Sequence, residues 1–106
     1  MVGRKPRRQL LCEHLSQMLL EDNKTYIDAK IDVRASWLLI EGVRGTYTTR
    51  GICIVMGRLK EGLIKEINDT IRPYLTPQDY EKLIDFIIDT VDTRTNLLKE
   101  QLEGLR

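Results

Sequence analysis

Strict alternation of apolar and polar residues over Tyr26–Ser36 constrains the fold of this chain more than any other feature. The apolar residues occupy the odd positions, namely Ile27, Ala29, Ile31, Val33 and Ala35. Side chains of a β-strand point alternately to two faces, so this pattern predicts a half-buried strand, and its β-branched content favours that interpretation. A helix stays open as the alternative, because Ala29, Val33, Trp37 and Ile40 also fit one helical face.

A second strand is predicted at the short apolar run from Ile52 to Met56, which lies between two glycines. The run is too short for a helix and is rich in β-branched residues. The segment Gly42–Gly45 has two glycines that suit a turn. A four-residue loop there would pair the two runs as a long antiparallel hairpin, with Ala35 facing Ile52 and the apolar rows on one side.

Helical periodicity flanks the predicted hairpin. Apolar residues recur at helical spacing from about Arg8 to Asp22 and again over Leu59–Ile71. Thr76-Pro77-Gln78-Asp79 is a helix start, with Thr76 as the N-cap residue. A final helix from there to about Glu103 would be about 42 Å long. We therefore expect it either to break near Thr93–Asn96, where helix propensity is poor, or to pack its end on another chain.

These elements predict an α+β protein with one N-terminal helix, a long hairpin and two C-terminal helices. Residues 1–8 are expected to form a flexible basic arm, and residues 9–106 a single domain. Because a two-stranded hairpin is marginal alone, a second subunit is expected to complete or cover the sheet, with a dimer as the first choice. The predicted interface residues are Trp37, Leu38, Ile40, Tyr47, Leu98 and Leu102.

Charge is balanced overall, with 17 basic and 16 acidic residues, but the N-terminus concentrates positive charge. Four cations in the first eight residues are close enough to follow a nucleic-acid phosphate backbone. Two other interpretations of this segment are a solubilising tail and a contact with the acidic row of the last predicted helix, formed by Asp85, Asp89 and Asp92. The predicted nucleic-acid-binding residues are Arg4, Lys5, Arg7 and Arg8.

The sequence offers little for catalysis or for a cofactor. His14, the only histidine, falls on the apolar side of the first predicted helix and is expected to be packed. Cys12 and Cys53 match no metal or redox spacing, and buried thiols in a reducing compartment are the simplest interpretation. The acidic row is expected to be a solvated face and not a metal site. No glycine-rich phosphate loop is found.

Two functional classes remain. The first is a small oligomeric binding or regulatory protein that contacts nucleic acid through its arm. The second is a structural or adaptor subunit that docks a protein partner through the hairpin and the long last helix. Neither class requires a cofactor or a metal, and an enzyme is not expected. No apolar run approaches the roughly 20 residues of a membrane span, so the chain is expected in the cytoplasm.

Overall fold

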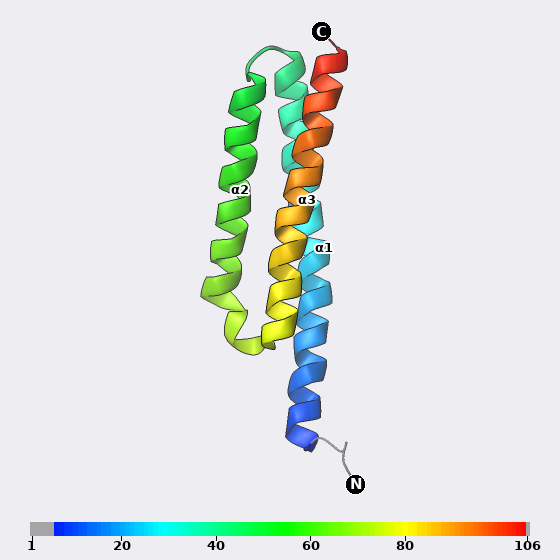
Figure 1. Cartoon of the computed structure of the whole chain (residues 1–106), viewed down its shortest axis with the longest axis vertical. Helices are drawn as coiled ribbons and strands as arrows, with labels where there is room; N and C mark the ends of the chain where they lie inside the picture. Colours follow the sequence, from blue (N-terminus) through cyan, green and yellow to red (C-terminus); the bar gives the residue numbers. More distant parts are fainter. Residues whose placement is uncertain (1–5, 106) are drawn as a thin grey trace.

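Three long helices make up the protein, which we describe from a computed structural model over residues 6–105. Helix α1 spans Arg7–Val43, α2 spans Thr49–Thr70 and α3 spans Pro77–Gly104, with a short 3₁₀ helix, η1, at Arg72–Tyr74. The helices run antiparallel to their chain neighbours and form a rod of 65 × 25 × 16 Å (Figure 1). Residues 6–105 contain no β-strand, so the predicted α+β class is wrong.

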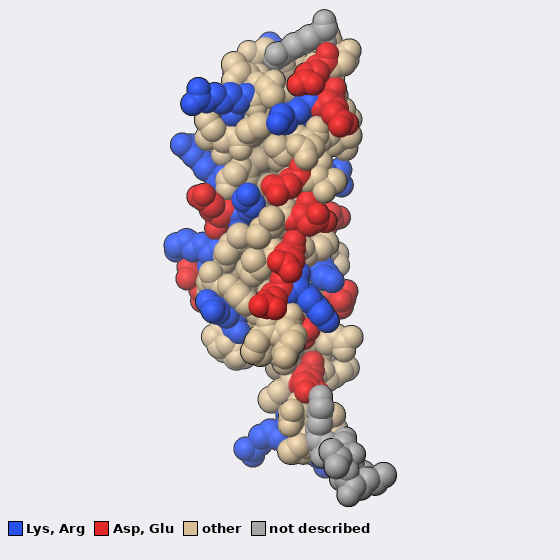
Figure 2. Space-filling model, in the orientation of Figure 1, with Lys and Arg blue, Asp and Glu red and all other residues tan. Residues whose placement is uncertain are grey.

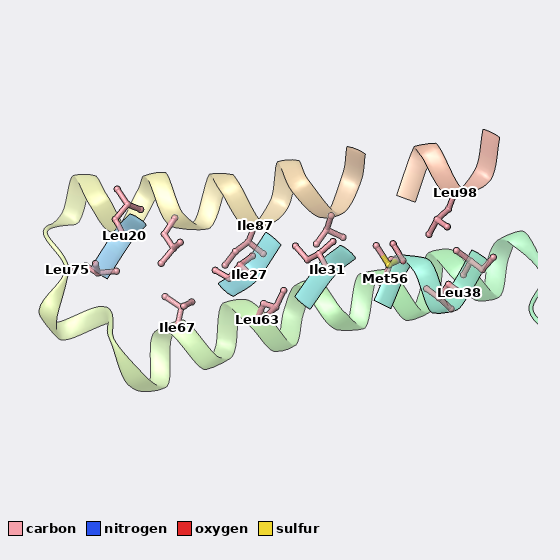
Figure 3. Packing of buried hydrophobic residues seen from close by; sticks show 14 of the residues in the cluster. Leu20, Ile27, Ile31, Leu38, Met56, Leu63, Ile67, Leu75, Ile87 and Leu98 are labelled. Atoms are coloured by element: carbon pink, nitrogen blue, oxygen red, sulfur yellow. The ribbon is translucent and has the colours of Figure 1, made fainter. Parts of the chain in front are cut away.

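The core runs along the length of the rod, where α3 packs against both α1 and α2 (Figure 3). Its side chains come from all three helices at spacings of three, four or seven residues, which places one face of each helix inward. Leu75, between η1 and α3, closes one end. The other core residues are Leu20, Ile27, Ile31, Ala35, Leu38, Ile52, Met56, Leu63, Ile67, Leu83, Ile87, Val91, Leu98 and Leu102.

The first predicted strand lies inside α1, and its alternation comes from two helical rows. Ile27, Ile31 and Ala35, each four residues apart, face the core. Ala29 and Val33 are also four apart, but they are exposed on the other side of the helix. Two such rows offset by two residues reproduce a period of two. Ile31 is completely buried while Val33 is 71% exposed, although a strand would put both on one face.

The second predicted strand lies inside α2. Ile52 and Met56, one helical turn apart, are buried, whereas Ile54 between them is 47% exposed. Thr48 begins this helix as its N-cap, and its hydroxyl accepts a hydrogen bond from the Gly51 amide at 3.0 Å. Packing against α1 and α3 therefore overrides the β-propensity of the run. Because residues 6–105 hold no strand, this part of the chain offers no sheet for a second subunit to complete or cover.

The turn between the predicted strands is the connection between α1 and α2, although it starts later than expected. Helix α1 continues through Gly42, and the connecting residues are 44–48. Gly45 has a φ of +84°, a left-handed conformation that glycine adopts without strain. The sequence therefore locates a reversal of the chain correctly, but the reversal joins two helices.

The start of α3 is the prediction that the structure confirms most closely. The Thr76 hydroxyl accepts a hydrogen bond from the Asp79 amide at 3.2 Å, and Pro77 is the first helical residue. The helix continues to Gly104 without a break at Thr93–Asn96. Its C-terminal half packs inside its own chain because α1 is long enough to accompany it. An Arg94–Asp32 ion pair of 3.1 Å joins α1 to α3 in this region.

One buried polar side chain links α1 to the start of α3. Ser16 is fully buried; its hydroxyl donates to Asp79 Oδ2 at 2.7 Å and accepts from the Thr76 amide at 2.9 Å. Both partners belong to the N-terminal cap of α3. Because a buried polar group is costly without a partner, these bonds favour one alignment of α1 against α3.

Ser16→Ala is expected to destabilise the protein by about 1–3 kcal/mol, because it leaves the Thr76 amide and the Asp79 carboxylate without this partner. Urea unfolding followed by circular dichroism measures the change. Ser36→Ala is the matched control, since Ser36 is exposed on the same helix and should change stability by less than about 0.5 kcal/mol. Equal effects at the two sites would contradict the role assigned to Ser16.

None of the helices described here is both long enough and apolar enough to cross a membrane.

Candidate docking surface

Helix α1 carries a second apolar face, opposite the core, that neither α2 nor α3 covers. Its members recur every three or four residues along most of the helix, and Asp22 is the one charged position among them. Several of these side chains are about half exposed. We call this row the outer stripe; it comprises Leu11, Leu15, Met18, Asp22, Tyr26, Ala29, Val33, Trp37 and Ile40. A helix with apolar residues on two faces is suited to contacts on both.

The outer stripe has two parts in different surroundings. Its N-terminal part, from Leu11 to Asp22, includes the end of α1 that projects beyond η1 and the start of α3 (Figure 1). Its C-terminal part, from Tyr26 to Ile40, runs beside α2. Helices α1 and α2 pack less closely against each other than either packs against α3, and a groove runs along this second part.

This α1–α2 groove is an open hollow of about 630 Å³ that adjoins a second one of about 430 Å³. Tyr26, Val33 and Trp37 from the outer stripe line it, together with Leu59 of α2. Leu59, Arg34 and Lys30 line both hollows, so the two are continuous. The lining is therefore largely apolar, with charged groups from both helices around it.

The charges around the groove do not cancel. The Lys30 ammonium lies 3.6 Å from Glu66 Oε2 and donates to the Tyr26 hydroxyl at 3.1 Å, while that hydroxyl donates to Glu66 Oε1 at 3.4 Å. The bond to Tyr26 raises the pKa of Lys30, and the Glu66 carboxylate acts in the same direction. Lys30 therefore stays charged and compensates Glu66. Within residues 6–105, neither Arg34 nor Arg58 forms an ion pair, so both leave the groove positive.

The six predicted interface residues separate into two groups. Trp37 and Tyr47 are in edge-to-face contact, with ring centroids 5.6 Å apart and planes at 66°, and Ile40 is exposed. The Arg34 guanidinium also lies 5.5 Å from the Trp37 ring. These residues lie on or beside the outer stripe and are available to a partner. The remaining three, Leu38, Leu98 and Leu102, are buried in the core of a single chain.

Of the four predicted phosphate-binding residues, two lie in the described part of the chain. Arg7 and Arg8 were expected in the flexible arm, but they form the first turn of α1 and are exposed. Arg4 and Lys5 lie outside the described residues. The backbone of these two arginines therefore belongs to a helix and not to an irregular arm.

The acidic row of α3 lies on the helix surface away from the core. Figure 2 shows acidic side chains following α3 along the visible face. Asp92 pairs with Lys60 at 3.7 Å, and Asp85 and Asp89 are exposed. Across residues 6–105, no three histidine, cysteine or acidic side chains are placed to hold a metal ion.

Three residues considered for catalysis lie differently from what the sequence suggests. His14 was expected to be packed, but it is exposed. Cys12 is exposed and Cys53 is half-buried, and both are free thiols. For His14 and Cys12, the physical reason is that the N-terminal end of α1 projects beyond η1 and the start of α3 (Figure 1), so apolar periodicity there does not imply burial.

Comparison with protein-family models, with curated proteins and with solved structures gave no match.

The groove residues Arg34, Arg58 and Leu59 were not among the predicted site residues. The signal for the outer stripe is in the sequence, where Ala29, Val33, Trp37 and Ile40 fit one helical face. If this segment is read as a helix, it carries this face and also the core row of Ile27, Ile31 and Ala35, so the helix has two apolar surfaces.

Proposed function

We propose that this protein is a small adaptor that docks an amphipathic helix of a protein partner in the α1–α2 groove. The observation that carries the proposal is an apolar row, Tyr26–Val33–Trp37, beside two uncompensated cations, Arg34 and Arg58. The proposed role is binding, not catalysis.

A helix with one apolar stripe fits a groove of this kind, because its side chains at positions i, i+3, i+4 and i+7 can enter between α1 and α2. Tyr26, Val33 and Trp37 would lose their exposure to water, which favours association. The net positive charge selects a partner whose helix has acidic residues beside the apolar stripe. Lys30 contributes little to this selection, since Glu66 already compensates it.

Trp37, the only tryptophan, allows a direct test because it lies in the groove. A synthetic amphipathic helix with a leucine stripe and glutamate flanks is expected to shift Trp37 fluorescence to shorter wavelength on titration. The same peptide with lysine flanks should bind at least about tenfold more weakly, because it places like charges beside Arg34 and Arg58.

The double variant Arg34→Glu, Arg58→Glu should reverse this preference and bind the lysine peptide more tightly. Lys82→Glu is the matched control: Lys82 is exposed on α3 and outside the groove, so its reversal should leave both affinities unchanged. Equal binding of the two peptides, or no binding by either, would refute the docking proposal.

A second proposal retains the nucleic-acid interpretation, in which Arg4, Lys5, Arg7 and Arg8 contact phosphates. It is supported by the exposure of Arg7 and Arg8 at the projecting end of α1. Such binding weakens steeply as salt is added. For either proposal, two free thiols support a reducing compartment such as the cytoplasm.

A further inference from the structure

A self-complementary row lies on the N-terminal part of α1, away from the groove. The row is Arg7, Leu11, Leu15, Met18 and Asp22, with spacings of four, four, three and four residues, so its members share one side of the helix. It begins with a cation, ends with an anion and has three apolar residues between them. All five are exposed, and the three apolar side chains are 48–62% exposed.

From this row we infer that the projecting ends of α1 from two copies of the chain pack antiparallel, with Leu15 close to a two-fold axis. In that arrangement Leu11 lies beside Met18 of the second copy and Arg7 lies beside its Asp22. The two-fold axis repeats both contacts, so one surface patch serves both chains.

Other ways of pairing two α1 helices are less favourable. A parallel pair in register would bring Arg7 against Arg7 and Asp22 against Asp22. An antiparallel pair that overlaps along the whole helix would set one acidic edge against its copy, since Glu21, Asp28 and Asp32 lie along one side of α1. Like charges in apposition oppose association. Among these pairings, the short antiparallel overlap places opposite charges at both ends.

The size of the contact predicts a weak dimer. Five large side chains in this region or close to it are 48–62% exposed, namely Leu10, Leu11, Leu15 and Met18 of α1 and Tyr74 of η1. If a large side chain has roughly 150–250 Å² of surface, these five present on the order of 500 Å² per chain. The pair would bury roughly 1,000 Å² in total, near the lower limit of specific interfaces, so we expect a dissociation constant in the micromolar range.

Sedimentation equilibrium of the full chain over a wide concentration range tests the dimer. Leu15→Glu, which places two carboxylates near the axis, should weaken association at least about 100-fold. Its helical circular dichroism should be retained, because Leu15 is about half exposed and lies outside the core cluster. Glu81→Arg on the exposed surface of α3 is the matched control and should associate like the wild type.

Charge exchange tests the antiparallel register. Arg7→Glu and Asp22→Arg should each weaken self-association about tenfold, whereas the two variants mixed together should form a heterodimer at least as tight as the wild-type dimer. The doubly substituted chain should recover wild-type affinity.

A wild-type chain that stays monomeric at 1 mM, or single variants that do not complement each other, would overturn the inference. So would an Arg7→Glu variant that associates like the wild type but loses salt-dependent binding to a DNA duplex, which would assign Arg7 to nucleic acid. These outcomes leave the groove proposal standing, because its peptide test uses other residues.

Discussion

Ile31→Ala is expected to reduce the free energy of unfolding by about 2–5 kcal/mol, while Val33→Ala changes it by less than about 0.5 kcal/mol. Ile31 is fully buried between the helices, and its truncation leaves a cavity in the core. Val33 is 71% exposed on the outer stripe, so little burial is lost there. Stability is typically 5–15 kcal/mol for a domain, so the first change is a large fraction of the total.

The stability losses of these two variants distinguish the helical fold from the hairpin that the sequence suggested. In a strand, positions 31 and 33 lie on the same face and the two substitutions would have similar costs. In a helix they are about 200° apart and the costs differ severalfold. Urea unfolding of both variants under one set of conditions, followed at 222 nm, measures the difference. Comparable losses at the two sites would contradict the three-helix core.

The same two positions show why the fold class was difficult to predict. The core row of Ile27, Ile31 and Ala35 and the outer row of Ala29 and Val33 interleave, so local periodicity alone fits either element. The decisive signal was of longer range: no glycine or proline occurs between Pro6 and Gly42. An uninterrupted stretch of that length accommodates a long helix more readily than a helix, a turn and a strand.

Features with a local physical cause were predicted well. The cap at Thr76 and Pro77 depends only on neighbouring backbone groups, and the structure confirms it. The apolar stripe of Leu59, Leu63 and Ile67 also has the expected helical periodicity, although α2 starts ten residues earlier, at Thr49. The three glycines within α2 concealed that start, because glycine is unfavourable in a helix and is more typical of turns.

The candidate surface was only partly predictable, because burial on a helix with two apolar faces depends on the helices around it. Trp37, Ile40 and Tyr47 are large apolar residues near the predicted turn, and they lie at or near the surface. Leu38 is adjacent to Trp37 in sequence, yet it points to the opposite side of the helix and is buried. Which of two apolar faces is covered depends on the neighbouring helices, and the sequence of α1 alone does not contain that information.

Gly42→Leu is expected to destabilise the protein by about 3 kcal/mol or more, because three helices meet at this glycine. A Cβ atom at position 42 would lie 2.8 Å from Leu102 Cδ1 and 3.3 Å from Ile52 Cδ1. Both side chains are buried, so they have little room to move. The glycine is therefore needed for close packing within α1 and not for the turn that the sequence suggested; the turn glycine is Gly45.

Gly57→Ala in α2 is the matched control for this close packing, since a Cβ atom there meets nothing within 4 Å. Alanine should stabilise the helix by about 0.5–1 kcal/mol relative to glycine, because it restricts the unfolded chain more. Thermal unfolding should thus show opposite shifts, with the melting temperature lower by more than about 12 °C for Gly42→Leu and higher by a few degrees for Gly57→Ala. Shifts of the same sign would mean that the three helices do not approach one another at Gly42 as described. In the structure, α1 continues through Gly42 because the missing side chain lets this last turn pack against Ile52 and Leu102. Shifts of the same sign would remove this explanation for the length of α1.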